Sequence, residues 1–177
     1  MDLRKIFDIV NHSSIFQALG YHGLQPPYIA LLQKLYSSQT GSIGNSKVFD
    51  ILCGVKQGDI LSALLFNCVL DIAFEDWKTQ LRDEGILVEN TRHSERLTNT
   101  RYADDVLIYA KSLKELEHMT ELLVVELRKV GLTLNTKKTK ILHSSDADEG
   151  AGTDFALIDD DFVQIPHADQ SHRYLGR

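Results

Sequence analysis

Residues 97–111, LTNTRYADDVLIYAK, decide the fold class. Two adjacent carboxylates, Asp104 and Asp105, stand between two extended arms, and the second arm, residues 106–110, is a continuous apolar run. Such a run is typical of a buried strand, so the stretch predicts two strands joined by a tight acidic turn. Two like charges side by side repel, and a bound Mg²⁺ with its preference for hard oxygen ligands would remove that cost. The alternative is a plain Asp-Asp turn, since Asp favours turns for local hydrogen-bonding reasons.

The rest of the chain alternates helical and extended patterns. Helices are predicted at residues 13–20, 26–38, 61–81 and, after a Ser112–Glu115 capping box, up to Gly131. Extended segments are predicted at residues 41–52, 132–134 and 141–143, and a hairpin at residues 155–158 and 162–165. This order predicts an α+β fold, with helices packed on one face of an antiparallel sheet.

Length and composition narrow the class of protein. The 177 residues suffice for one domain with a real core. The two cysteines are too few for a disulfide scaffold. With no apolar run of roughly 18 residues and no signal-peptide core, the chain is predicted to be intracellular and soluble, with no membrane partner. The net charge of −6 weighs against a nucleic-acid partner, but residues 1–142 hold 17 of the 19 basic and 17 of the 25 acidic residues and are neutral.

Four further motifs are weak when each is taken alone. Gly54–Ser62, GVKQGDILS, is a glycine-bounded loop before a helix, which either binds an anion through backbone amides or only turns the chain. Asp2–Asp8, DLRKIFD, would otherwise be a charged N-terminus, and Lys137–Lys140, KKTK, a solvated turn. The fourth motif is Tyr174-Leu175-Gly176.

In their order and spacing these motifs resemble the palm of reverse transcriptases, closest to those of non-LTR retrotransposons and group II introns. An Asp, four residues, an aromatic and a second Asp match residues 2–8; GxxQGDxLS matches residues 54–62; YADD stands at 102–105. Gly131–Asn135 with Lys138 resembles the next motif, and residues 174–176 the primer-grip turn. The resemblance implies an RNA-directed DNA polymerase palm with a catalytic β-hairpin at the YADD turn.

The resemblance also implies roles for single residues. Asp2, Asp104 and Asp105 would be the catalytic carboxylates that bind two Mg²⁺ ions, with Mn²⁺ as an alternative, for transfer of a nucleotide to a primer 3′-hydroxyl. Lys138 would lie near the pyrophosphate leaving group, although Lys137 or Lys140 could take that register.

The nucleotide and the primer would contact a second set of residues. Phe7 would exclude a ribose 2′-hydroxyl, although simple core packing also explains an aromatic residue there. Gln57 and Gly58 would lie against the incoming deoxynucleoside triphosphate and the template base, with Gly58 needed because a side chain would collide. Tyr174, Leu175 and Gly176 would border the primer. The partners implied are thus an RNA template, a DNA primer and deoxynucleoside triphosphates.

Some positions depart from the family pattern. Ile60 and Ala63 stand where proline is common, and Ile6 where a small residue is common, which predicts a packing conflict beside Phe7. Tyr102 is expected to pack beside the catalytic turn or to fill the apolar layer beneath it.

The resemblance leads us to expect that residues 1–177 are one truncated palm domain, with fingers missing upstream and a thumb missing downstream. The isolated chain is therefore expected to be inactive or weak. Residues 144–161 are expected to form an acidic insertion, a loop and hairpin at the solvent edge. If the carboxylates of Asp2, Asp104 and Asp105 bind metal ions, the other charged residues of 1–142 carry a net positive charge. The net charge of the chain then no longer argues against a nucleic-acid partner.

Two alternatives remain at this stage. The chain could be a non-catalytic retroelement relic that keeps the palm fold as a binding module. A palm-type cyclase is disfavoured because such enzymes lack GxxQGD together with YADD. The compartment is expected to be the nucleus if the parent is a eukaryotic retroelement.

Overall fold

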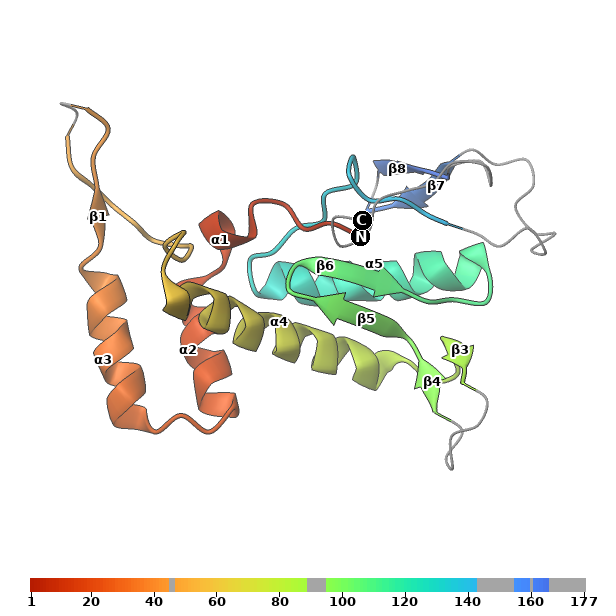
Figure 1. Ribbon diagram of the computed structural model, residues 1–177, viewed down its shortest axis with the longest axis horizontal. Helices are drawn as coiled ribbons and strands as arrows, with labels where there is room; N and C mark the ends of the chain where they lie inside the picture. The colour runs from red at the N-terminus through yellow and green to blue at the C-terminus, as the bar shows by residue number, and fades with distance from the viewer. Residues whose placement is uncertain (45–46, 89–94, 143–154, 160, 166–177) are drawn as a thin grey trace. The chain divides into compact units, whose positions relative to one another are not determined.

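The computed structural model of the chain, drawn in Figure 1, describes residues 1–44, 47–88, 95–142, 155–159 and 161–165. The chain divides into two compact units. Unit 1 comprises Met1–Arg4, Asp76–Glu126 and Thr133–Arg177; unit 2 comprises Lys5–Glu75 and Leu127–Leu132.

Five helices lie within the described residues, and the four longer ones confirm the predicted helices. They are α1 (Ile6–Ile9), α2 (His12–Tyr21), α3 (Pro26–Ser37), α4 (Ile60–Gln80) and α5 (Leu113–Lys129). Helix α3 begins at Pro26 because proline suits the first turn, where its missing N–H leaves no carbonyl unpaired. Helix α5 is followed by Gly131, whose φ of 84° is a conformation that favours glycine.

The described strands form four two-stranded antiparallel sheets instead of the single sheet expected. The pairs are β1 (Thr40–Gly41) with β2 (Phe49–Asp50), β3 (Ile86–Leu87) with β4 (Arg96–Leu97), β5 (Asn99–Tyr102) with β6 (Asp105–Ile108), and β7 (Phe155–Ile158) with β8 (Asp161–Gln164). The hairpin predicted at residues 155–165 is therefore confirmed. The molecule is a mixture of helices and small antiparallel sheets, as predicted in outline.

The first four residues connect two parts of unit 1. On one side, Met1 and Val106 exchange two backbone hydrogen bonds, of 2.8 and 3.4 Å. On the other side, Leu3 forms a β-bridge with Leu134, and Arg4 N donates to the carbonyl of Thr133 at 2.9 Å. The N-terminal segment thus lies between β6 and residues 133–135, which confirms extended chain near 132–134.

The hairpin β7–β8 belongs to the core of unit 1. Ile158 and Val163 are buried together with residues from α5 and from the segment after it: Val124, Leu134, Ile141 and Ile165. The expectation that residues 144–161 lie at the solvent edge is wrong for Ile158, because its apolar side chain is only 2% exposed. Residues 143–154 and 160 lie outside the described residues.

Unit 2 buries one face of α2 and part of α4. Its buried side chains include Val10, Ile15, Leu19, Leu65, Phe66, Val69 and Phe74. Helix α3 packs against α2, and Figure 1 shows the two helices joined by a short turn. Tyr28, Leu31 and Leu35 of α3 stay more than half exposed.

Two local features differ from the predictions. The Ser112 hydroxyl accepts the Glu115 N–H as predicted, but the Glu115 carboxylate accepts the N–H groups of Gly85 and Lys111 instead of completing the capping box. Ile141 and Leu142 form no strand, although Ile141 is buried. Within the described residues, no helix combines the length and the apolar character that crossing a membrane requires.

Candidate active site

Asp2 is held by the segment that follows α5. Its backbone carbonyl accepts the Asn135 N–H at 2.9 Å, and its backbone N–H donates to the Thr139 hydroxyl at 3.2 Å. Its carboxylate Oδ2 accepts a hydrogen bond from Asn135 Nδ2 at 2.8 Å. Both the backbone and the side chain of Asp2 are therefore positioned by residues more than 130 positions away in the sequence.

The two other predicted carboxylates lie at the turn between β5 and β6. Tyr102 pairs with Asp105, so that Ala103 and Asp104 form the two-residue turn. Ala103 has a φ of 53°, a left-handed conformation that fits the tight hairpin turns. Asp104 is exposed and Asp105 is partly buried. Tyr102 is 69% exposed, so it does not fill an apolar layer beneath the turn.

The carboxylates of Asp2 and Asp105 both influence the ammonium group of Met1. Burial lowers the pKa of the Met1 ammonium, and the negative charges of Asp2 and Asp105 partly oppose that shift. This agrees with the pairing of Met1 with Val106, the residue after Asp105. Among the described residues, however, no three His, Cys, Asp or Glu side chains converge as a complete set of metal ligands.

Lys138 lies in the same unit as the three carboxylates. Its backbone N–H donates to the carbonyl of Asn135 at 3.1 Å, within the turn that also holds Asp2. Its side chain is exposed, as are those of Lys137 and Lys140, so burial does not distinguish the three lysines.

Phe7 lies in α1 of unit 2 and is half-buried. Its ring centroid is 5.7 Å from that of Phe66, with the planes tilted by 50°. The ring thus packs against the core and still has an accessible part. Ile6, the residue before Phe7, is buried with 7% of its surface exposed.

The segment Cys53–Val55 is tied to the end of α1. Gly54 N donates to the Val10 carbonyl at 2.8 Å, and Val55 N donates to the Phe7 carbonyl at 2.6 Å. Gly54 has a φ of 85°, and a Cβ there would lie 2.7 Å from the carbonyl oxygens of Phe7 and Asp8. Only glycine fits this position without a shift of the backbone.

The tip of the same loop is open. Gln57 and Gly58 are exposed, and a Cβ on Gly58 would meet no atom within 4 Å. The φ of 85° at Gly58 gives a reason for glycine that needs no ligand. Beyond it, Asp59 Oδ1 accepts the Leu61 N–H at 2.9 Å and caps the start of α4. Ile60, which stands where the family often has proline, is 94% exposed.

Two groups of predicted site residues therefore emerge. Unit 1 contains Asp2, Asp104, Asp105 and Lys138; unit 2 contains Phe7, Gln57 and Gly58. The predicted primer-grip residues Tyr174, Leu175 and Gly176 lie outside the described residues. The sequence predicts no role for Asn135, because its only signal is its place between an extended segment and a basic turn.

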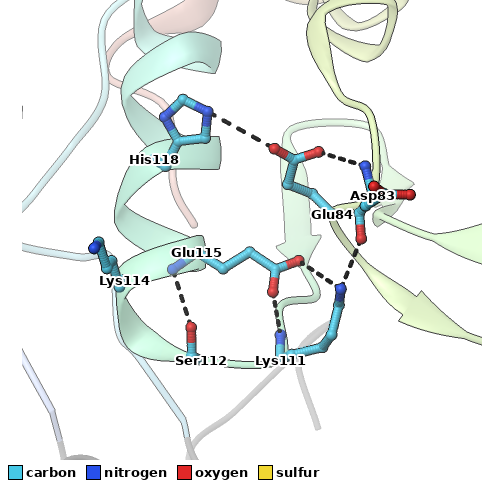
Figure 2. Close-up of a pocket in the computed structure, with 7 residues that line it drawn as sticks. All are labelled: Asp83, Glu84, Lys111, Ser112, Lys114, Glu115 and His118. Carbon is cyan, nitrogen blue, oxygen red and sulfur yellow. Dashed lines mark hydrogen bonds and ion pairs between the residues drawn. The ribbon is translucent and has the colours of Figure 1, made fainter.

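A cleft of about 370 Å³ lies elsewhere in unit 1, at the start of α5 (Figure 2). Its lining contains both charge signs: Asp83, Glu84, Lys111, Ser112, Lys114, Glu115 and His118. Figure 2 shows His118 facing Glu84, 3.8 Å apart, and Lys111 between Glu115 and the Asp83 carbonyl. Backbone N–H groups, first that of Arg82, lower the pKa of Glu84. None of these residues belongs to the predicted site.

The segment with Asp2 and the hairpin with the Asp104–Asp105 turn both belong to unit 1, whereas the GxxQGD loop belongs to unit 2. Comparison with known proteins shows the family of the chain: the pattern of the "Reverse transcriptase (RNA-dependent DNA polymerase)" family matches residues 1–177, and the chain belongs to this family.

Curated relatives of this chain include Pol polyproteins of R2 retrotransposable elements. The chain is 32% identical over 143 residues to a retrovirus-related Pol polyprotein from the type-2 retrotransposable element R2DM of Drosophila melanogaster, covering 78% of this chain and 13% of that protein. It is 29% identical over 184 residues to a Pol polyprotein from the type-1 element R2 of Popillia japonica, covering 99% of this chain and 25% of that protein. The chain thus spans a quarter or less of these relatives.

Proposed function

We propose that this chain is the palm of an RNA-directed DNA polymerase from an R2-like non-LTR retrotransposon. It would add deoxynucleotides to a primer 3′-hydroxyl under the direction of an RNA template. The observation that carries the proposal is the position of residues 1–4 between β6 and residues 133–135, since it brings Asp2 and the Asp104–Asp105 turn into one unit.

The donor set suits divalent cations of the magnesium type. Mg²⁺ binds through one or two carboxylates and keeps waters or substrate phosphates in its other positions, so a closed protein cage is not required. Asp2, Asp104 and Asp105 would hold the ions, with Mn²⁺ as a substitute. When bound, the ions supply charge neutralisation at the attacking and leaving oxygens.

The chain's own residues would divide the remaining work. Asp2 would contribute a carboxylate, one oxygen of which already accepts a hydrogen bond from Asn135. Lys138, exposed on the turn beside Asp2, would stabilise negative charge on the pyrophosphate group. Phe7 would limit space at the sugar, and Gln57 with Gly58 would form an accessible edge for the nucleotide and template.

Primer extension tests the proposal. The chain would replace the matching segment of the Popillia japonica polyprotein, with the unaltered polyprotein assayed in parallel. We expect Mg²⁺-dependent extension on an RNA template by the substituted protein, and loss of extension to background when Asp104→Asn is introduced. Asp104 is exposed at a turn, so we expect Asp104→Asn to leave the fold intact, and a thermal melt checks this.

Two outcomes would contradict the proposal. One is a substituted protein that melts like the parent but does not extend a primer. The other is an Asp104→Asn variant that retains extension. Lys114→Gln is the matched control, because Lys114 is a charged residue of unit 1 that lines a different cleft and belongs to no predicted site.

A further inference from the structure

A small hydrogen-bonded ring surrounds Asp2. Asn135 donates its backbone N–H to the Asp2 carbonyl and its side-chain amide to the Asp2 carboxylate. The Thr139 hydroxyl accepts the Asp2 N–H and donates to the carbonyl of Asn135 at 2.9 Å. A hydroxyl has one proton to donate, and this arrangement uses it while the oxygen still accepts.

The same ring fixes the turn that carries Lys138. The carbonyl of Asn135 accepts three donors: the Lys138 N–H at 3.1 Å, the Thr139 N–H at 2.9 Å and the Thr139 hydroxyl. Thr139 is 5% exposed, so water cannot readily replace its hydrogen bonds. The position of the Asp2 side chain and the course of the Lys138 backbone therefore depend on one residue, Asn135.

We propose that Asn135 is a positioning residue for the metal-binding carboxylate of Asp2, and that Thr139 supports it. This inference rests on the proposed function for its role in catalysis. Asn135 binds only Oδ2 of the carboxylate, which fixes the side chain and leaves the other oxygen available to a cation. Partners that orient a ligand in this way typically change metal affinity about 10- to 100-fold when removed.

The first measurement needs no metal. Three-bond couplings in the NMR spectrum of the chain report the χ1 angle of Asp2. We expect one rotamer in the unaltered chain and averaging among rotamers in Asn135→Ala, with little change in melting temperature because Asn135 is only partly buried. Averaging in the unaltered chain, or one rotamer retained in Asn135→Ala, overturns the inference.

The second measurement is titration with Mn²⁺ followed by electron paramagnetic resonance. We expect Asn135→Ala to weaken binding about tenfold or more. In the NMR measurement, Asn135→Asp should also cause averaging of the Asp2 χ1 angle, since it loses the amide donor and places a like charge beside Asp2. Thr139→Val should weaken Mn²⁺ binding less than Asn135→Ala does. Thr139→Ser should bind Mn²⁺ like the unaltered chain, because the hydroxyl is kept. Lys137→Ala, an exposed change in the same turn, is the matched control.

The two measurements separate the inference from the proposed function. If Asp2 keeps one Asn135-dependent rotamer but the chain binds no Mn²⁺, the proposed metal site fails while the hold of Asn135 on Asp2 stands. If Mn²⁺ binds and Asp2→Asn abolishes binding, but Asn135→Ala does not change the affinity, the proposed function stands and the positioning role is wrong.

Discussion

The surroundings of Asp2 and the loop from Gly54 to Ile60 provide candidate site residues in two different ways. In the first region the functional side chain itself is bound, since the Asp2 carboxylate accepts a hydrogen bond from Asn135. In the second region both ends of the loop are bound, through Gly54 and Val55 at one end and Asp59 at the other, while Gln57 and Gly58 between them are exposed.

This difference matches the partners proposed for each region. A small hard cation demands well-placed oxygen ligands, so prior positioning of Asp2 lowers the cost of binding. A nucleotide and a template base are large, and a loop that is fixed at both ends and exposed at its tip gives them access. Hydrogen bonds therefore hold the proposed metal ligand and the ends of the loop, and leave the side chain at the loop's tip exposed.

The largest expected effect is on stability, and it differs between Gly54, at the anchor of the loop, and Gly58, at its tip. Gly54→Ala should lower the free energy of unfolding by about 3 kcal/mol, from left-handed backbone strain together with the clash against the carbonyls of Phe7 and Asp8. Gly58→Ala should cost only about 1 kcal/mol, because strain acts without a clash. Urea denaturation measures both variants. Equal losses would contradict the distinction between anchor and tip.

A middle-sized effect concerns Phe7, which lies beside the anchor. In the substituted polyprotein, Phe7→Val should raise ribonucleotide incorporation relative to deoxynucleotide incorporation on the order of tenfold to a hundredfold, because the smaller side chain leaves room for a 2′-hydroxyl. Phe7→Tyr, which keeps the ring, is the control. If Phe7→Val lowers stability without changing sugar selection, the contact with Phe66 is the whole role of the ring.

The smallest expected effect tests the far side of the loop. Asp59→Ala removes the acceptor for the Leu61 N–H at the start of α4 and should cost about 1 kcal/mol of stability. Asp59→Asn keeps an acceptor oxygen and should cost less. Thermal unfolding measures the difference. A neutral Asp59→Ala would mean that the loop is anchored on its Gly54 side alone.

The sequence predicts those helices and hairpins that are determined by residues adjacent in the chain. Helix α3 was predicted to within a residue because Pro26 begins it, and the hairpin β7–β8 because two apolar runs flank an acidic turn. The hydrogen bond that the Glu115 carboxylate accepts from the Gly85 N–H could not be predicted, because the two residues lie 30 positions apart in the sequence. A capping box describes only contacts within one helical turn.

The candidate site shows the same division. The acidic turn at Asp104 was predicted from adjacent residues, and so was the glycine loop. The burial of Ile158 and the hydrogen bonds of Asn135 depend on segments that meet only in the folded unit, so no spacing rule could reveal them. The φ of 85° at Gly58 is likewise a property of the folded backbone, and it favours glycine without any ligand.

The pairing of the first four residues also has a kinetic consequence. Met1 meets Val106 across 105 residues, and Asp2 meets Asn135 across 133 residues. Residues so distant in sequence can meet only after long loops have closed, which costs chain entropy before the new hydrogen bonds compensate for it. Such contacts therefore slow folding. The acidic hairpin can form from neighbouring residues within microseconds, whereas Asp2 joins it only when the whole of unit 1 has closed. Assembly of the carboxylates is thus expected to be a late folding event.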